Sequence, residues 1–464
     1  MKSYYSVIQG FREKIPKLNI PRIGEKEFSA PRFNENAPSK LIAKEVISPN
    51  DLKIALTCGD HDSLALGLKI KSFNDGIKDN PHYIRLSHQI KLVGGLLKWR
   101  NRTNDGSLTD EINQTLSLLG HSSPVKGKGI KILSLDGGGT RGLMSLHILR
   151  ILEEEFGGKN LINEFDLVFG TSTGAIVAFL TCIAKFSVEE AIEQYRKIAV
   201  EIFTQTRLDG TGTFIRERSW YNTKKFEEHL RSYKLSKEPL YVASKLQSPK
   251  VCAVSCLLDS NVISPYIFRS YNHHPLRPSR NQGDCYTPCW QVLRATTAAP
   301  LYFADISLNG QRHQDGGVLV NNPTALAIHE ARQIWPDTPL QTVLSIGTGL
   351  IQSQTGSVDD GFTSSFKKTV FNFMDSATNT ESVHTTLKDL LPHTTYFRFN
   401  PQIKEPFPLD ECRPNKLNLL VFEAHRYSQR HYKRVSKTVQ SLMQKKRFYQ
   451  RFQDWAEYWA ARLI

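Results

Sequence analysis

A serine between two glycines is the group in this sequence best suited to act as a nucleophile. Residues 170–174 read Gly-Thr-Ser-Thr-Gly, and they follow the apolar run Phe165–Phe169 at the start of a helical segment. In a sharp turn from strand to helix, Gly170 and Gly174 would remove the Cβ atoms that clash, and the hydroxyl of Ser172 would be raised for attack. The same five residues are compatible with a helix that Ser172 merely caps.

A glycine-rich loop upstream favours the catalytic interpretation. The apolar run Lys131–Leu135 predicts a buried strand, and apolar residues from Leu143 onward recur at helical spacing. Glycines in the loop between them let the backbone approach a substrate closely and turn successive amide N–H groups into one concavity, which stabilises developing negative charge. The loop is therefore a candidate oxyanion hole, and its residues are Gly137, Gly138, Gly139, Thr140, Arg141 and Gly142.

A carboxylate beside two glycines follows later in the chain. Asp315, Gly316 and Gly317 stand between a predicted strand and a helix expected from Pro323 to Gln333. A buried carboxylate in such a turn can approach a serine hydroxyl and accept its proton as a general base, with no histidine between them. An isolated Asp-Gly-Gly is usually only a turn, but the three motifs in this order form a specific combination.

These motifs make the chain similar to the patatin-like phospholipases, whose signature combines a G-G-G-x-[RK]-G loop, a G-x-S-x-G turn and an Asp-Gly-Gly. Residues from about 125 to 420 look like the catalytic domain of the calcium-independent phospholipases A2. The resemblance continues more weakly back to about residue 60 and forward through the C-terminal helix. The further matching stretches are Pro124–Gly129, Ala298–Phe303, His313–Gly317, Asn321–Pro323 and Leu391–Asn400.

The resemblance implies an activity and a site. The activity is that of a calcium-independent phospholipase of A2 or A1 type, which releases fatty acid from membrane glycerophospholipids through an acyl-enzyme; the alternative is a lysophospholipase or transacylase. The implied catalytic dyad is Ser172 and Asp315, with residues 137–142 as the oxyanion loop. Arg141 would either anchor the lipid phosphate or form a structural ion pair. No cofactor and no metal ion are expected to take part.

The expected fold is α/β. Strands and helices alternate from residue 131 to residue 346, which favours a mostly parallel sheet covered by helices, with reactive groups at the strand ends. With the resemblance, this becomes a patatin-like three-layer sandwich preceded by a small α-helical domain. The polar stretch from Thr204 to Ser248 is expected to be irregular and could form a lid or an entry loop. The predicted divisions are a basic flexible segment at 1–39, an α-helical accessory domain at 40–123, the catalytic domain at 124–420 and a basic amphipathic helical region at 421–464.

The accessory domain is predicted from helical patterns that Gly, Asn and Asp interrupt. Its last helix is expected to begin at a capping sequence around Ser107. The predicted helices are Leu41–Ile47, Asp51–Thr57, Ser63–Phe73, Ile84–Trp99 and Leu108–Leu119.

The charge balance favours an anionic partner. The 464-residue chain has 60 Lys and Arg against 45 Asp and Glu, a net charge of +15. Such an excess suits either nucleic acid or a membrane surface with acidic lipids. The family resemblance selects the phospholipid membrane, so no nucleic acid is expected.

The C-terminal stretch would contact either that membrane or the catalytic domain. Its basic sequence carries an apolar stripe that could lie on an anionic bilayer or pack as a closing helix. No apolar run reaches the length of a bilayer span, so membrane association is expected to be peripheral, at a mitochondrial, peroxisomal or endoplasmic reticulum membrane, and the oligomeric state is left open. The residues of the stripe are Val435, Val439, Leu442, Phe452, Trp455 and Trp459.

The cysteines do not predict a metal site. Two of the pairs, Cys252 with Cys256 and Cys285 with Cys289, enclose histidines and could be drawn as a zinc site. Their spacing is wrong for a zinc knuckle, and residues 251–256 predict a buried strand. No acidic run has the alternation of a calcium-binding EF-hand loop. The seven cysteines are expected to be reduced thiols.

Three other functions remain possible from the sequence. The spacing Gly137-x-Gly139-x-x-Gly142 also fits a dinucleotide-binding fingerprint, with Glu164 or Asp166 as the acid. An α/β-hydrolase would use Ser172 and an aspartate with His384 or His393 as a triad. A third reading is a basic membrane-associated scaffold with an inactive hydrolase domain. The first leaves Ser172 and Asp315 unexplained, and the last is disfavoured because all the motif residues are present.

Overall fold

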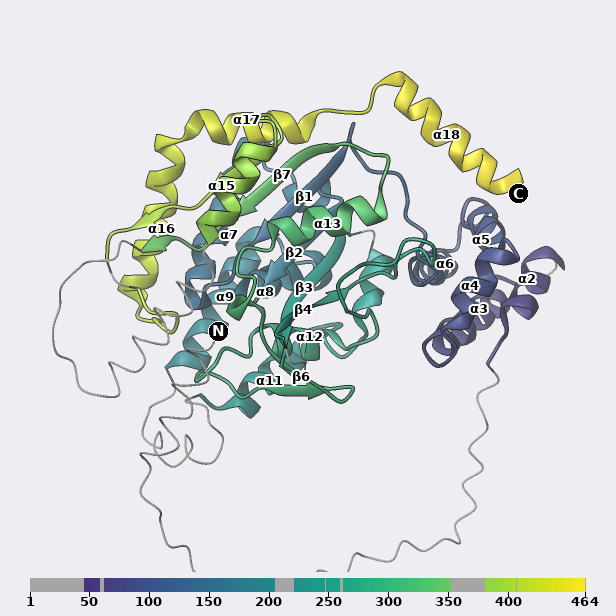
Figure 1. Ribbon diagram of the computed structural model, residues 1–464, viewed down its shortest axis with the longest axis horizontal. Coiled ribbons are helices and arrows are strands. Elements are labelled where there is room, and N and C mark those ends of the chain that lie inside the picture. The colour runs from purple at the N-terminus through teal and green to yellow at the C-terminus, as the bar shows by residue number, and fades with distance from the viewer. Residues whose placement is uncertain are drawn as a thin grey trace, which may run out of the picture. The chain divides into compact units, whose positions relative to one another are not determined.

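The computed structural model describes most of the chain after residue 45 (Figure 1). The predicted basic segment at 1–39 and most of the predicted helix Leu41–Ile47 lie outside the described residues, and all the predicted domain boundaries stay predictions. The described residues are 46–58, 62–204, 221–246, 248–258, 262–351, 380–405 and 407–463.

A mostly parallel sheet forms the centre of the fold, as the sequence predicts. In the part of the chain that the structure describes, the sheet has eight strands in the order β5-β6-β3-β2-β1-β7-β9, with β4 paired to β3. The neighbours from β3 to β9 are parallel, whereas the pairs β3–β4, β3–β6 and β5–β6 are antiparallel. The strands are β1 Ile130–Leu135, β2 Leu167–Thr171, β3 Lys250–Leu257, β4 Ser264–Arg269, β5 Ile306–Leu308, β6 Gln311–Asp315, β7 Leu340–Ile346 and β9 Tyr396–Phe399; β8 Leu350–Ile351 and β10 Gln402–Ile403 pair separately.

Helices cover both faces of this sheet, which makes three layers (Figure 1). On β1, Ile130 and Ile132 face the core that includes α13, whereas Leu133 and Leu135 face the core that includes α7 and α8. A parallel strand that is buried on both faces has a mostly apolar sequence, which explains why β1 could be predicted. The helices of these layers are α7 Gly142–Glu155, α8 Thr173–Ala178, α9 Val188–Phe203, α12 Cys289–Thr296, α13 Thr324–Ile334 and α15 Thr380–Leu390.

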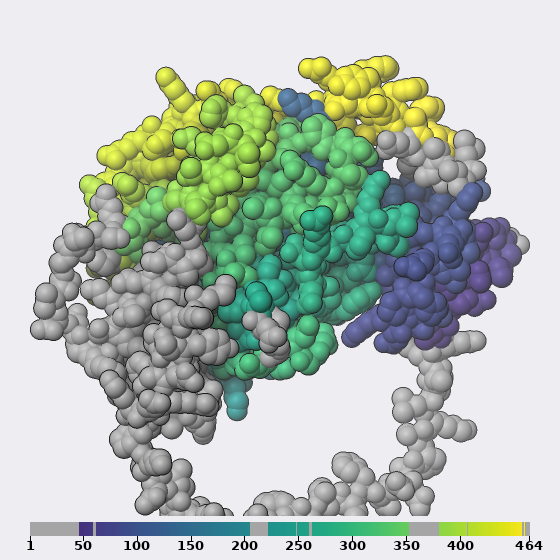
Figure 2. Space-filling view, viewed as in Figure 1, coloured from purple at the N-terminus to yellow at the C-terminus, as the bar shows by residue number. Residues whose placement is uncertain are grey.

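The N-terminal helices pack around a second core, to which Leu52, Leu66 and Phe73 contribute buried side chains together with Tyr241 and Cys285 from the later part of the chain. Their apolar residues recur at helical spacing, so each helix buries one face. Figure 2 shows these purple and blue helices against the teal and green part of the chain. The helices are α2 Pro49–Cys58, α3 Ser63–Asp79, α4 His82–Gln89, α5 Leu92–Arg100 and α6 Gly106–Leu118.

Two local predictions in this region were wrong. The expected single helix from Ile84 to Trp99 is divided into α4 and α5, because Lys91 adopts a left-handed conformation with φ of 61°. The cap of α6 is Asp105 and not Ser107, since the Asp105 carboxylate accepts hydrogen bonds from the amides of Ser107 and Leu108 at 2.8 and 3.4 Å. A carboxylate at the N-cap satisfies amides that have no partner within the helix.

The described part of residues 204–248 is more regular than the sequence predicted. Their described part contains α11 Thr223–Ser232 and a 3₁₀ segment Leu240–Leu246, while residues 205–220 lie outside the described structure. Asn222 caps α11 by accepting a hydrogen bond from the Lys225 amide at 3.0 Å. Helix α11 is short and buries only one narrow face, so its many charged residues obscured the apolar periodicity that would have predicted it.

The C-terminal region forms three helices, α16 Pro414–Arg430, α17 Tyr432–Met443 and α18 Phe448–Leu463. The predicted apolar stripe is divided between two of these helices, α17 and α18. On α17 the stripe is buried against the sheet, whereas on α18 Phe452, Trp455 and Trp459 remain 58%, 55% and 39% exposed. Across the described residues, no helix combines the length and the apolar character required to cross a bilayer.

Helix α13 is fixed to the sheet by a buried carboxylate. Glu330 is fully buried, and its oxygens accept hydrogen bonds from Arg269 at 2.7 and 3.0 Å and from Tyr271 at 3.2 Å. His273 and Ser279 lie at 2.7 and 2.6 Å from the same carboxylate. Burial alone would raise the pKa of Glu330, but the hydrogen bonds and charges of His273 and Arg269 hold that pKa well below its usual value.

The Glu330→Gln variant should therefore be strongly destabilised. Removing the charge leaves Arg269 buried without its counter-ion, which typically costs about 3–5 kcal/mol of unfolding free energy. Urea denaturation at pH 7 measures the loss, with Glu228→Gln, an exposed position on α11, as the matched control. Equal denaturation midpoints for the two variants would contradict the assigned role of Glu330.

Candidate active site

Ser172 occupies a strained turn between β2 and α8. Its φ of 52° and ψ of −120° lie in a region that residues with a Cβ atom rarely adopt. A Cβ on Gly170 would lie 2.4 Å from the Ala175 amide nitrogen, and one on Gly174 would lie 2.2 Å from the carbonyl oxygen of Leu135. Both glycines are therefore required by backbone packing, and the turn raises the Ser172 side chain above the end of the strand.

Asp315 lies directly opposite this serine. The Ser172 hydroxyl donates a hydrogen bond to Asp315 Oδ2 at 2.7 Å, and Asp315 Oδ1 accepts the amide of Gly317 at 2.7 Å. Asp315 ends β6 and is almost completely buried. Burial raises the pKa of Asp315 to about 7, although the hydrogen bonds from Ser172 and Gly317 act in the opposite direction. A carboxylate with such a pKa is a stronger base than an exposed one.

The glycine loop offers two unpaired amides beside the serine. Within the described residues, the amide N–H groups of Gly138 and Gly139 have no acceptor, whereas the amide of Thr140 donates to Leu409 O at 2.8 Å and that of Arg141 to Gly138 O at 3.2 Å. A Cβ on Gly138 would lie 2.1 Å from the Thr348 hydroxyl oxygen. The six predicted loop residues thus divide into two amides free to bind an oxyanion and others that hold the loop in place.

Arg141 has a structural role in this loop. Its side chain is buried, and Nε donates to the carbonyl oxygen of Gly138 at 3.3 Å. Because that carbonyl belongs to the peptide whose nitrogen is Gly139 N, the guanidinium helps to fix the orientation of one unpaired amide. This contact gives Arg141 a structural function, and the residue also lines the cavity that contains Ser172.

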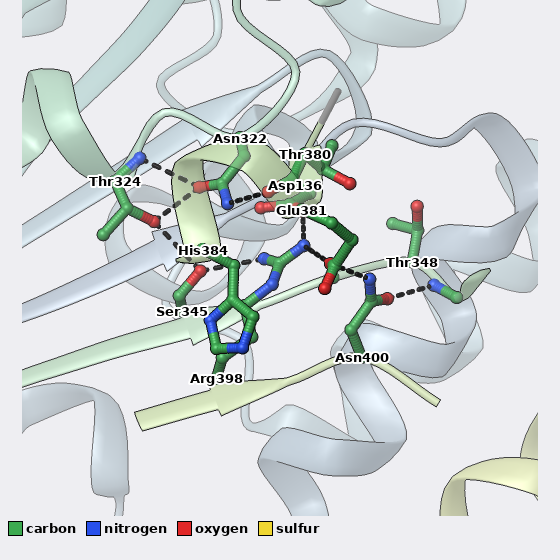
Figure 3. A network of polar contacts seen from close by, with 12 residues as sticks. Asp136, Asn322, Thr324, Ser345, Thr348, Thr380, Glu381, His384, Arg398 and Asn400 are labelled. Carbon is green, nitrogen blue, oxygen red and sulfur yellow. Dashed lines mark hydrogen bonds and ion pairs between the residues drawn. The ribbon is translucent and has the colours of Figure 1, made fainter. Parts of the chain in front are cut away.

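A buried ion pair beneath the loop was not predicted from the sequence (Figure 3). Asp136, the residue before the first glycine, pairs with Arg398 on β9 at 2.7 Å, and both side chains are 2% exposed. Arg398 also donates to Ser345 Oγ at 2.8 Å and lies 3.3 Å from Glu381. Burial raises the pKa of Asp136 to about 6, while Arg398 lowers it. The only signal was that Arg398 lies in the stretch Leu391–Asn400, which resembles the family.

The serine, the aspartate and the two amides line one cavity with an apolar wall. The cavity holds about 890 Å³ of space including its open mouth. Its polar end is formed by the three motifs. The wall comes from α8, α9, α11 and the loop after α12, through Ile176, Ile198, Ile202, Phe203, Phe226, Tyr302 and Phe303. Such a wall suits a hydrocarbon chain whose polar end lies at Ser172.

The structure separates the histidines of the alternative triad from this cavity. His384 contacts the Tyr396 hydroxyl at 3.1 Å, and His393 is exposed. No histidine is among the described residues that line the cavity. The hydrogen-bond partner of the Ser172 hydroxyl is a carboxylate, so the geometry does not support a triad with either histidine.

The dinucleotide-binding alternative also fails on geometry. Asp166 precedes β2 and accepts the amides of Lys126 and Lys131 at 2.9 and 2.8 Å, and Glu164 forms an ion pair with Lys131. These acids lie at the amino ends of the strands, whereas the glycine loop follows the carboxyl end of β1. A ribose-binding acid must lie at the carboxyl end.

Cysteines from the two pairs considered for a zinc site contact different side chains. The Cys252 thiol contacts the Tyr271 hydroxyl at 3.4 Å, and the Cys285 thiol contacts Asn272 Oδ1 at 3.2 Å. All seven cysteines are free thiols. Within the residues that the structure describes, no three His, Cys, Asp or Glu side chains are arranged to hold a metal ion.

Comparison with known proteins places this geometry in a family. A model of the patatin-like phospholipases matches residues 133–328, a range that contains all three motifs. Patatin-like protein 3 of Arabidopsis thaliana is 30% identical over 301 residues, which are 54% of this chain and 67% of that protein. The chain belongs to the patatin-like phospholipase family. The resemblance inferred from the motifs is thereby confirmed.

Two further relatives of this patatin-like chain are named for an activity. Calcium-independent phospholipase A2-gamma of Mus musculus is 40% identical over 366 residues, covering 79% of this chain and 47% of the relative. Phospholipase A I of Arabidopsis thaliana is 28% identical over 352 residues, covering 62% of this chain and 26% of the relative. The chain therefore spans about half the length, or less, of these two curated relatives.

The strain at Ser172 predicts an unusual order of stability among variants. Ser172→Gly should unfold with a free energy about 1 kcal/mol higher than Ser172→Ala, because glycine relieves backbone strain of about 1–3 kcal/mol and loses part of this gain to its own flexibility. Urea denaturation of both variants measures the difference. At Ser436, inside helix α17, the same two substitutions should give the opposite order. A Ser172→Ala variant more stable than Ser172→Gly would show that the turn is not strained.

Proposed function

We propose that this chain is a calcium-independent phospholipase of A2 or A1 type, which hydrolyses an acyl ester of membrane glycerophospholipids. The observation that carries the proposal is the 2.7 Å hydrogen bond from the Ser172 hydroxyl to the buried Asp315 carboxylate, beside two unpaired amides and an apolar cavity. Family membership and the names of the relatives support the same activity.

The first half of the reaction would form an acyl-enzyme. Asp315 accepts the Ser172 proton as Oγ attacks the ester carbonyl, and the amides of Gly138 and Gly139 donate hydrogen bonds to the resulting oxyanion. The tetrahedral intermediate collapses by breaking the bond to the glycerol oxygen, which takes the proton from Asp315. The lysophospholipid leaves and the acyl group stays on Ser172.

The second half would release the fatty acid. A water molecule gives a proton to Asp315 and attacks the acyl carbonyl, and the same two amides stabilise the second oxyanion. The intermediate then breaks its bond to Ser172 Oγ, which recovers the proton from Asp315. Throughout both halves, the acyl chain would lie against the apolar wall from α9 and α11. The scheme uses only side chains and amides of this chain, with no cofactor.

The proposed partner is the surface of an anionic phospholipid membrane, contacted peripherally. The net charge of +15 supports it, and α18 adds exposed aromatic side chains next to the exposed cations Lys445, Arg447 and Arg451. Gln450 on α18 donates to Lys128 O at 2.8 Å, just before β1, whereas Ser172 follows the carboxyl end of β2. Since these are opposite ends of the sheet, α18 would tether the protein to a membrane and not feed lipid into the cavity. A mitochondrial, peroxisomal or endoplasmic reticulum membrane would fit this proposal.

The activity test compares three proteins on vesicles of phosphatidylcholine and cardiolipin in excess EGTA. Wild type should release fatty acid and lysophospholipid, and Ser172→Ala should release none. Asp315→Asn should lose about 10²–10⁴-fold in rate, the usual contribution of a general base. Asp389→Asn, at an exposed position on α15, is the matched control and should keep full activity, as should His384→Gln and His393→Gln.

Two results would contradict the assigned roles in that experiment. Persistent activity in Asp315→Asn would remove Asp315 as the base, and activity lost on changing either histidine would revive a triad. Vesicle binding with no lipid hydrolysis by wild type would favour the scaffold interpretation.

The pH dependence should report the carboxylate of Asp315. A general base acts only when it is unprotonated, so a pKa of about 7 predicts that kcat/KM falls as the pH drops through 7. The measurement is the initial rate of hydrolysis of a neutral, soluble short-chain phosphatidylcholine between pH 5 and 9. A rate independent of pH over this range would show that Asp315 is not the base in the rate-limiting step.

A further inference from the structure

A second cavity lies on the side of the catalytic domain that meets the N-terminal helices. It holds about 960 Å³ of space including its mouth, and it shares no lining residue with the cavity at Ser172. Its walls come from the end of α4, the start of α5, residues 120–122 after α6, the loop after β4 and the end of α13. The polar residues of its lining are His88, His121, Ser122, Asn272, His273, His274, Arg277 and Gln333.

Direct hydrogen bonds fix the two halves of this cavity relative to each other. Asn272 donates from Nδ2 to Leu118 O at 2.9 Å and from its amide to Ser117 O at 3.1 Å. Ser117 Oγ donates to Ser270 O at 3.1 Å. The cavity is therefore a built feature of the contact between α6 and the loop after β4.

The described residues of the lining include basic side chains and no acidic one. Of the described residues that line the cavity, none is Asp or Glu, whereas four are His and one is Arg. The carboxylate that reaches His273 is that of Glu330, which already accepts hydrogen bonds from Arg269, Tyr271 and Ser279. An incoming anion would thus find hydrogen-bond donors among the described lining residues, none of which is itself a carboxylate.

Of the lining residues, His121 has the surroundings that best suit a bound anion. Its ring has no hydrogen-bond partner among the described residues, and the charged groups that act on it are all basic: Arg100 on α5, Lys250 on β3, His88 on α4 and His274 in the loop after β4. Burial first, and then these neighbours, lower the pKa of His121 to about 4. With this pKa, the His121 ring is neutral at pH 7.

The other histidines are already oriented. His88 Nε2 lies 2.6 Å from Leu119 O, so it donates there, and its ring centroid lies 4.4 Å from that of His274. His274 Nδ1 accepts the Leu276 amide at 3.2 Å, which leaves its other nitrogen as a donor. His88 Nε2 and His274 Nδ1 already have hydrogen-bond partners, and His274 Nε2 is left as a donor. The cluster therefore suits a negatively charged hydrogen-bond acceptor better than a metal ion.

We propose that this cavity binds a phosphate-type dianion, either free phosphate or the phosphomonoester of a lipid headgroup, through His121, His274 and Arg277. The bound anion would neutralise the basic groups around His121 and join α4 and residues 120–122 to the loop after β4. The site is separate from the proposed catalytic cavity, so it does not depend on the proposed phospholipase activity.

The first test is calorimetric titration of the full chain with inorganic phosphate at pH 7. Wild type should bind one phosphate, and His121→Gln and Arg277→Gln should each weaken binding about tenfold, equal to about 1.4 kcal/mol. Arg280→Gln removes the same charge from the same loop outside the lining and should leave the affinity unchanged. Arg277 is exposed, so its variant should fold as wild type does, which thermal melting monitors.

The second test measures the uptake of protons when an anion binds. Sulfate keeps two negative charges between pH 6 and pH 8, so any change in its affinity over this range comes from the protein. An anion raises the pKa of a neighbouring histidine, and sulfate should therefore bind more tightly at pH 6 than at pH 8 with uptake of protons. Titrations in buffers of different ionisation enthalpy measure this uptake, and His121→Gln should reduce it.

A third arm separates the two sources of the phosphate. Ser172→Ala protein, which should leave the lipid intact, is sedimented with phosphatidylcholine vesicles with and without phosphatidic acid. Binding that requires phosphatidic acid, falls in the additional His121→Gln variant and is displaced by inorganic phosphate identifies a headgroup. Equal sedimentation of both proteins, with phosphate still bound in calorimetry, identifies free phosphate.

The proposal is wrong if wild type binds neither phosphate nor sulfate at pH 6. It is also wrong if binding is the same in His121→Gln, Arg277→Gln and Arg280→Gln, because the anion then lies elsewhere.

Discussion

The three motif turns pack so closely against the strands and against one another that their glycines leave no room for a side chain. A Cβ on Gly174 would meet the Leu135 carbonyl oxygen, and one on Gly316 would lie 2.3 Å from the Val254 carbonyl oxygen. A Cβ on Gly137 would lie 3.2 Å from that of Ser172. This backbone contact, which only glycine permits, places a hydroxyl, a carboxylate and two amides at one end of an apolar cavity.

Two buried aspartates beside that contact differ because their surroundings differ. Asp136 faces the guanidinium of Arg398, so its charge is compensated and it serves to anchor the glycine loop. The Asp315 carboxylate accepts hydrogen bonds from a hydroxyl and an amide, and burial has the largest influence on its pKa. Burial without a cation favours the protonated carboxyl, which is the property that suits a proton acceptor in the proposed reaction.

The proximity of the three motifs could be predicted because glycines in short motifs specify local backbone contacts. The alternation of strands and helices and the apolar run of β1 likewise reflect burial on both faces. Other features depend on distant parts of the chain. The ion pair of Asp136 requires β9, and the division of the C-terminal stripe depends on which helix meets the sheet. The left-handed turn at Lys91 has no glycine to mark it, so periodicity alone predicted one continuous helix there.

The order of the chain has a consequence for biosynthesis. The turn that contains Ser172 and the turn that contains Asp315 are both synthesised before β9. A growing chain on the ribosome therefore carries both turns while Asp136 still lacks its partner Arg398. A buried carboxylate without its cation disfavours the compact arrangement of the glycine loop. By this argument, the glycine loop reaches its compact arrangement only after residue 398 has left the ribosome, so the proposed catalytic centre would be completed late in synthesis.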